Sequence, residues 1–177
     1  MSHKFFYFIP LLLLCYGCGS AFYSEEYTIK TTKKDFVNKV DSFKNCHTEY
    51  KCYEHDKYGN LIDSDYADAP YAIALGDSTL LRYSISFYIP STEKIFRCYI
   101  IPYDSLSEDE SFVLQFCLIS DTNYLNICEI NTKDLSYIEN KKYKIVFEQE
   151  ILDKLDVEWE KEGCLWVLLK NIISRIS

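Results

Sequence analysis

Apolar and polar residues alternate along the middle of the chain. In the segment 81–89 every second residue is Leu, Tyr, Ile or Phe, and Arg, Ser, Ser and Tyr stand between them. This period of two is typical of a strand with one buried face. The Pro-Ser-Thr at 90–92 predicts a turn, and 94–101, 112–120 and 124–130 follow as further strands. We therefore expect an antiparallel meander of about four strands, with one face covered by helices.

Two other segments repeat their apolar residues with the period of a helix. Phe36, Val40 and Phe43 recur at spacings of four and three, which predicts a helix over 32–44. Near the end of the chain, Leu and Ile residues over 165–176 form a narrow apolar stripe. Such a stripe most often lies in the protein's own core, and docking on a partner or a membrane surface is the alternative. Packed against the meander, these N- and C-terminal helices define an α+β fold.

Two parts of the chain have a less regular pattern. Over 136–155, Ser136 and Glu139 have the spacing of a capping box, which predicts the start of a helix, although 143–147 also fits a strand. Over 45–69, Gly, Asn and Asp residues interrupt the apolar ones without a period. We expect an irregular region there, with short strands flanking Gly59.

The start of the chain has the order of a secretory signal. Lys4 supplies a positive charge, residues 5–16 carry no charge and are rich in Leu and Phe, and small residues follow from Gly17 onwards. A helix that spans a bilayer needs about 20 apolar residues, which is more than this run provides. We therefore expect residues 1–17 to be a signal peptide that is removed from the folded domain.

Two processing sites are compatible with this signal. A general signal peptidase would cut after the Gly-Ser-Ala at 19–21, which would make the protein a plain secreted one. The run Leu-Cys-Tyr-Gly-Cys-Gly at 14–19, however, resembles the lipobox of bacterial lipoproteins, in which a small residue precedes an invariant cysteine. The resemblance implies that Cys18 carries lipid and anchors the chain to a membrane. The whole chain is similar to small lipoproteins of Bacteroidota, which implies export and anchoring but no particular activity.

The length and net charge of the chain without its signal limit both its domain organisation and its partners. Removal of residues 1–17 leaves 160 of the 177 residues, enough for one domain with a single core. The signal holds one basic and no acidic residue, so 18 basic and 27 acidic residues remain and the net charge is −9. Phosphate backbones repel such a chain, which argues against nucleic-acid binding and leaves the lipid as the means of membrane attachment. We expect a lipid-anchored tether over 18–30 and a single α+β domain over 31–177.

The chain contains eight cysteines. Cys15 lies in the signal, and Cys18 is the expected lipid acceptor. In an oxidising compartment the other cysteines are candidates for disulfides: Cys46, Cys52, Cys98, Cys117, Cys128 and Cys164. Six cysteines allow many pairings, so the connectivity stays open. A tight turn at 121–123 would place Cys117 opposite Cys128, either as two packed thiols or as a bond.

The candidate metal ligands lie in one loop. Cys46, His47, Cys52 and His55 lie within ten residues, and zinc prefers four such ligands. Their spacing matches no zinc motif, and a Cys46–Cys52 or longer-range disulfide is the alternative that an exported protein favours. The carboxylates over 63–68 lack the glycine and the distal glutamate of an EF-hand loop, which favours a solvated turn over a calcium site. We assign no catalytic residue, no metal and no cofactor.

The sequence lacks the motifs of serine hydrolases, zinc proteases, P-loop proteins and dinucleotide-binding proteins. We therefore expect a cell-envelope lipoprotein that acts as a non-catalytic binding or interaction module. An envelope factor, or an immunity protein that blocks a toxin through an acidic face, would fit. The 16 tyrosines suit recognition of a protein partner. The alternative is an envelope enzyme or metal-binding protein that uses the loop 46–55.

Overall fold

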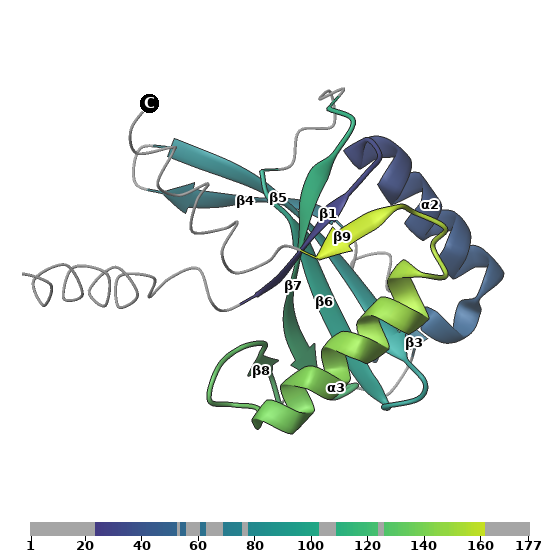
Figure 1. The fold of residues 1–177 in the computed structure, drawn as a ribbon, viewed down its shortest axis with the longest axis vertical. Helices are drawn as coiled ribbons and strands as arrows, with labels where there is room; N and C mark the ends of the chain where they lie inside the picture. The colour runs from purple at the N-terminus through teal and green to yellow at the C-terminus, as the bar shows by residue number, and fades with distance from the viewer. Residues whose placement is uncertain are drawn as a thin grey trace, which may run out of the picture.

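The computed structural model has an antiparallel sheet at its centre (Figure 1). It describes residues 24–52, 54–55, 61–62, 69–75, 78–102, 109–123 and 126–161, with the backbone alone between 54 and 80. The strand order is β4-β5-β6-β7-β1-β9, and β8 also pairs with β7. These strands are β1 Glu25–Ile29, β4 Ala69–Leu75, β5 Ser78–Ile89, β6 Lys94–Ile100, β7 Phe112–Ser120, β8 Cys128–Glu129 and β9 Trp159–Lys161. A separate pair, β2 Glu54–His55 and β3 Leu61–Ile62, flanks Gly59 as expected.

The α+β fold class is confirmed, and four consecutive strands lie side by side, but they are not the four that the pattern predicts. Strands β5, β6 and β7 match the predicted segments 81–89, 94–101 and 112–120. The fourth strand is β4, which pairs along the other edge of β5. Of the predicted strand 124–130, the described residues form only the short β8, which pairs with β7, and the Ile130 amide donates to the Cys117 carbonyl at 2.9 Å. The helix predicted over 165–176 lies outside the described residues.

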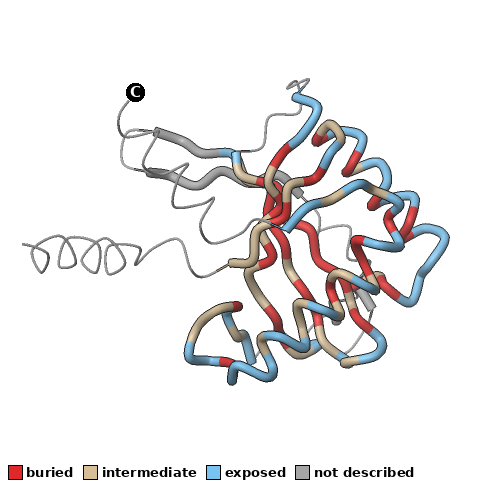
Figure 2. The backbone as a smooth tube through the Cα atoms, in the orientation of Figure 1, coloured by how far each residue is buried: buried red, intermediate tan, exposed pale blue. Residues whose placement is uncertain are grey.

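One face of the sheet forms the core together with the helices. Ile85 of β5 lies opposite Cys98 of β6, which lies opposite Phe116 of β7, and all three side chains are fully buried. The helices α2 (Lys33–Cys46) and α3 (Tyr137–Phe147) lie on the same side of this sheet (Figure 1). Figure 2 shows that buried residues line the sheet and the inner side of α2, whereas most of α3 is exposed or half-buried.

A β-bulge changes the direction of the side chains in β7. Arg97 and Cys98 of β6 lie opposite Leu118 and Phe116 of β7, so Cys117 is the extra residue. Without an extra residue, two side chains three positions apart would point to opposite faces of a strand. Because of the bulge, Phe116 and Ile119 both belong to the core.

The predicted pairing of Cys117 with Cys128 is wrong. Cys128 lies opposite Ile119, two positions further along β7. The reason is that the connection is longer than a tight turn. The Asp121 carboxylate accepts hydrogen bonds from the side chains of Lys94 and Asn126, which stabilises a wide loop before β8 begins.

The tether expected over 18–30 is wrong at its C-terminal end, because residues 25–29 form a strand of the sheet. Strand β1 lies between β7 and β9 in the sheet, and its Tyr27 and Ile29 side chains are fully buried. Strand β9 forms within the acidic run after residue 155, where the pattern predicts no strand. Both strands place only one or two apolar residues on the core face, which is too short a repeat for a period to be recognised.

Both helix starts follow the sequence signals. The Thr32 hydroxyl accepts a hydrogen bond from the Asp35 amide at 3.1 Å and caps α2. At the start of α3, Ser136 and Glu139 form the reciprocal capping box. Residues 143–147 belong to α3, so the strand alternative for them is wrong, and the helix continues as a π-helical segment, η4 (Glu148–Leu152). Neither helix of the described chain has the length and apolarity that crossing a membrane requires.

Candidate functional site

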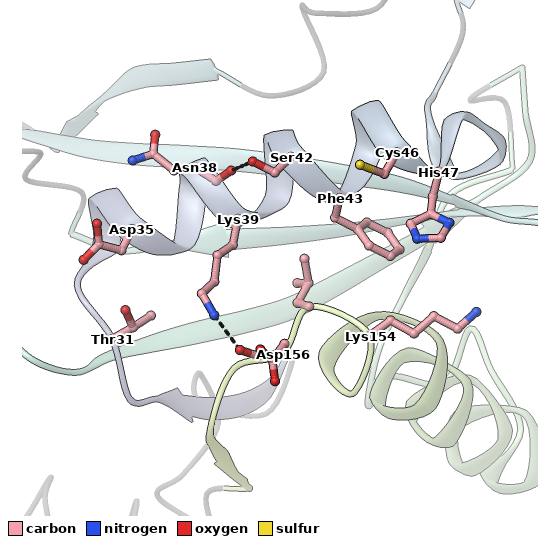
Figure 3. A pocket seen from close by; sticks show the side chains of 11 residues that line it. Thr31, Asp35, Asn38, Lys39, Ser42, Phe43, Cys46, His47, Lys154 and Asp156 are labelled. Carbon is pink, nitrogen blue, oxygen red and sulfur yellow. Dashed lines mark hydrogen bonds between the residues drawn. The ribbon is translucent and has the colours of Figure 1, made fainter.

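An open groove lies between α2 and the turn after η4 (Figure 3). Its volume is about 660 Å³. Phe43 and Leu155, both almost fully buried, supply its apolar surface. The remaining lining residues are polar or small: Thr31, Asp35, Asn38, Lys39, Ser42, Cys46, His47, Lys154 and Asp156. The groove therefore combines a small apolar floor with many hydrogen-bonding groups along its rim.

A hydrogen bond across the groove fixes its width at one end. Lys39 of α2 donates from Nζ to the backbone carbonyl of Asp156 at 2.5 Å (Figure 3). Asp156 has a φ of 51°, in the left-handed region that aspartate tolerates better than most residues other than glycine. This conformation turns the chain from η4 toward β9 and presents the carbonyl to α2. The α2 helix and the turn are thus held together by a bond that the sequence pattern does not reveal.

The other end of the groove is formed by aromatic and charged side chains around Tyr50. This residue belongs to the short 3-10 helix η2 (Thr48–Tyr50). Lys154 donates from Nζ to the Tyr50 hydroxyl at 2.5 Å, and this hydroxyl donates to Glu150 at 3.4 Å. The hydrogen bond with Tyr50, together with Glu150 and Glu49, raises the pKa of Lys154 above its ordinary value. Lys154 therefore remains a cation at the rim of the groove.

The structure brings only part of the predicted metal loop to this groove. Cys46 and His47 line it and are exposed, and Figure 3 shows the Cys46 sulfur and the His47 ring pointing in different directions. His47 lies 3.5 Å from the Glu49 carboxylate and packs on Phe43 with a ring separation of 4.9 Å. Within the described side chains, no three His, Cys, Asp or Glu residues come together as a metal site. The side chain of His55 and the segment 63–68 lie outside the described residues.

The predicted disulfides are not formed among the described cysteines. Cys46, Cys52, Cys98, Cys117 and Cys128 are thiols, and no bond joins any two of them. Cys46 is exposed on α2 whereas Cys52 is buried beside Ile95, so the predicted Cys46–Cys52 bridge is wrong. Burial raises the pKa of the Cys117 thiol to about 12, which makes it a poor nucleophile. Cys18 and Cys164 lie outside the described residues.

A second polar site, which the sequence reasoning missed, lies at the start of β1. We name it the Glu25 cluster; it consists of Glu25, Tyr27, Lys144, Glu148 and Lys161. The Glu25 carboxylate lies 2.7 Å from Nζ of Lys144 and 2.8 Å from Nζ of Lys161. Lys161 also lies 2.9 Å from Glu148, which accepts a 3.0 Å hydrogen bond from the Tyr27 hydroxyl. The cluster thus joins β1, α3, η4 and β9.

The charge states within the Glu25 cluster follow from these contacts. Burial alone would raise the pKa of Glu25, but hydrogen bonds from Lys144, Lys161 and Asn131 outweigh it and hold the pKa below its ordinary value. Burial would lower the pKa of Lys161, and its bonds to Glu25 and Glu148 raise it instead. Burial and the two carboxylates raise the pKa of Tyr27. Glu25 and Lys161 are therefore held ionised and Tyr27 neutral, which fits a structural clamp rather than an acid–base pair.

Comparison with other proteins assigns no family to this chain. No family model matches it, and no curated protein and no solved structure is significantly similar to it. The groove, the Glu25 cluster and the exposed surfaces are therefore the features from which a function can be inferred.

Proposed function

We propose that the protein is a cell-envelope lipoprotein, anchored through Cys18, whose domain binds a protein partner and performs no catalysis. The proposed lipid anchor is supported by the uncharged apolar run that ends at Gly17-Cys18. Only five residues lie between Cys18 and Ser24, at the entry to the sheet. We include in the proposal that the helix predicted over 165–176 packs on the sheet as a C-terminal helix.

The groove is the proposed recognition site. It is open, about 660 Å³ in volume, and has an apolar floor with a hydrogen-bonding rim, which suits a segment of another protein chain. The divergent directions of Cys46 and His47 offer no activated nucleophile, because a thiol needs a base within hydrogen-bond reach. Lys39 and Lys154 provide cations beside Asp35 and Asp156, so the rim can pair with either sign of charge.

Intact mass of the native protein tests the anchor. Lipidation predicts that residues 1–17 are absent and that acyl chains are present on Cys18. The Cys18→Ala variant is then expected to leave the membrane fraction, whereas the matched Cys46→Ala variant stays there. A native protein that begins at residue 22, or that retains Met1, contradicts the lipoprotein proposal.

A groove-blocking variant tests recognition. Ser42 lines the groove and is exposed, so Ser42→Arg fills it without altering the core. Asn45→Arg adds the same charge at an exposed position of α2 that does not line the groove. A strain that lacks the protein is expected to show one of two defects. Either it competes less well with neighbouring strains, or it is less resistant to detergents. Wild type and Asn45→Arg should restore the lost property, and Ser42→Arg should not. Full restoration by Ser42→Arg at equal protein levels would show that the groove is not the recognition site.

The alternative of a metal or thiol site in the loop 46–55 has its own test. The exposed Cys46 and His47 on the groove rim are the observation that favours it. Metal content of the purified full-length protein separates the two proposals. Stoichiometric metal that is lost in His47→Ala and His55→Ala would overturn the non-catalytic proposal in favour of a metal site.

A further inference from the structure

The outer face of α3 exposes apolar side chains. Tyr137 is 80% exposed and Ile138 is 77% exposed, and Ile145 is exposed two turns further along the helix. Ile127, beside β8, is 51% exposed. Ile138 and Ile145 are seven residues apart and therefore lie on the same face of the helix. Since only Phe147 of α3 is fully buried, this outer face is directed away from the sheet.

Basic side chains accompany these apolar ones. Lys141 and Lys142 are exposed on α3, and Lys133 is exposed on the turn before it. The acidic groups nearby are Glu129, Asp134 and Glu139, and the Glu139 carboxylate is bound to the Ser136 amide at 2.9 Å in the capping box. Lys144, the third lysine of α3, is paired with Glu25. Helix α3 therefore carries more basic than acidic residues in a chain with a net charge of −8.

The chain enters the described domain beside this face. Asn131 donates from its side-chain amide to the Ser24 carbonyl at 2.8 Å, and its backbone amide donates to the Asn140 side chain of α3 at 2.8 Å. Glu25 is paired with Lys144 of the same helix. Figure 1 shows the start of β1, β8 and the start of α3 on the same side of the molecule. Direct contacts through Asn131 and Lys144 thus hold the entry point of the chain against α3, the helix that bears the exposed face.

We propose that the outer face of α3 docks on the surface of the bilayer that holds the Cys18 lipid. Tyr137 and Ile138 would lie at the level of the headgroups, with Lys141 and Lys142 against lipid phosphates. This inference rests on the proposed anchor. The six residue-to-residue steps from Cys18 to Ser24 span at most about 21 Å, so the lipid and this face are close enough to meet the same membrane.

The anchor makes a weak surface contact effective. Few apolar residues and two exposed lysines would bind a membrane only weakly by themselves. A covalent lipid holds the face near the membrane at high effective concentration, which converts docking into an intramolecular step. A preference for anionic lipids is expected, because lysines are attracted by the negative surface potential.

Tryptophan fluorescence of the full-length lipidated protein in vesicles tests the proposal. Tyr137→Trp places a probe on the face, and Asn45→Trp places the same probe at an exposed position on α2. In vesicles of phosphatidylglycerol and phosphatidylethanolamine, brominated lipids should quench the emission of Tyr137→Trp beyond that of the wild type. The Asn45→Trp control should show no additional quenching. The double variant Lys141→Glu/Lys142→Glu should lower the ratio of docked to undocked protein more than about tenfold. The control Lys34→Glu, on α2, should not lower this ratio.

Two negative results are distinguishable. If intact mass shows acyl chains on Cys18 but the probe at 137 is quenched no more than the probe at 45, the docking proposal is overturned while the lipoprotein proposal stands. The face would then be open to a protein partner instead. If Cys18 carries no lipid, the proposed anchor has failed and docking fails with it.

Discussion

The two helices of the described chain lie on the same sheet but are held there in different ways. Helix α2 places Phe36, Val40 and Phe43 in the core along one continuous stripe. Helix α3 buries only Phe147 completely; Tyr143 and Val146 pack against the core while partly exposed, and Lys144 adds an ion pair with Glu25. The comparison shows that a helix attached through a few apolar contacts and an ion pair can leave apolar side chains exposed on its outer face.

The difference between α2 and α3 determines how well the apolar residues of each helix identify its buried face. An apolar stripe both predicts a helix and identifies its buried face, as α2 illustrates. In α3 the apolar Tyr137 and Ile138 are exposed, whereas Lys144 is mostly buried, with 18% of its side chain accessible. Hydrophobicity alone would orient this helix wrongly.

The largest loss of stability is expected from the apolar docking of α2. Phe36 is fully buried and packs edge-to-face on Phe112 with a ring separation of 5.3 Å. Phe36→Ala should lower the free energy of unfolding by about 3–5 kcal/mol, because it removes buried surface and leaves a cavity. Urea denaturation measures this loss, with the exposed Ile145→Ala of α3 as the control. A loss below about 1 kcal/mol would mean that α2 does not depend on its stripe.

A smaller loss is expected when the charged docking of α3 is broken. Glu25→Gln leaves Lys144 and Lys161 without their shared carboxylate. An unpaired charge on the mostly buried Lys144 is costly, but Lys161 keeps Glu148 and 43% of its side chain is accessible to solvent, so we expect a loss of about 2 kcal/mol at neutral pH.

The pH dependence of this loss follows from the lowered pKa of Glu25. A carboxylate with a depressed pKa in the folded state stabilises the protein above its ordinary pKa of 4.5, and the stabilisation is lost as the pH falls through the folded value. The difference in unfolding free energy between wild type and Glu25→Gln should therefore be full at pH 7 and shrink on acidification below about pH 5. A difference that is constant down to pH 3 would show that Glu25 is not ionised in the cluster.

Loss of the capping box should lower the free energy of unfolding less than the changes above, and its effect should be confined to the start of α3. Ser136→Ala removes the hydroxyl that caps α3 and should lower the free energy of unfolding by about 1 kcal/mol. Because the first turn of α3 has little apolar burial, hydrogen exchange should rise first at the amides of 137–140. Thr32→Ala removes the corresponding cap of α2, where the stripe should limit such local fraying. Equal fraying in both variants would contradict the proposed difference between the helices.

The smallest effect is expected on the outer face of α3. Ile138→Ser changes a side chain that is 77% exposed and should alter the free energy of unfolding by less than about 0.5 kcal/mol. The matched variant Phe147→Ser, in the buried face of the same helix, should be strongly destabilised. Urea denaturation of both variants separates an interaction surface from a packing surface. A large loss in Ile138→Ser would mean that this side chain already has a partner within the chain.

The elements that the sequence predicts well are those that repeat one signal several times. Strand β5 alternates over nine residues of the segment 81–89, and α2 combines an apolar stripe with the Thr32 cap. The start of α3 is marked by the reciprocal pair Ser136 and Glu139. Each of these signals is local, since it depends on neighbours within about one turn or one strand.

The elements that the sequence misses depend on distant partners. Strand β1 becomes a strand because β7 and β9 lie on either side of it, and Glu25 becomes buried because Lys144 and Lys161 arrive from far along the chain. The groove likewise needs α2 and the turn at Asp156 to meet. Of the predicted site residues, Cys46 and His47 reach this groove, whereas Cys52 is buried elsewhere.

The sequence by itself determined the α+β class, the central strands and both helix starts, because these follow from short-range periodicity and capping. Only the tertiary structure decided the position of β1 in the sheet, the separation of the cysteines and the face that α3 exposes. These depend on which distant side chains share a buried space, and local patterns carry no information about such partners.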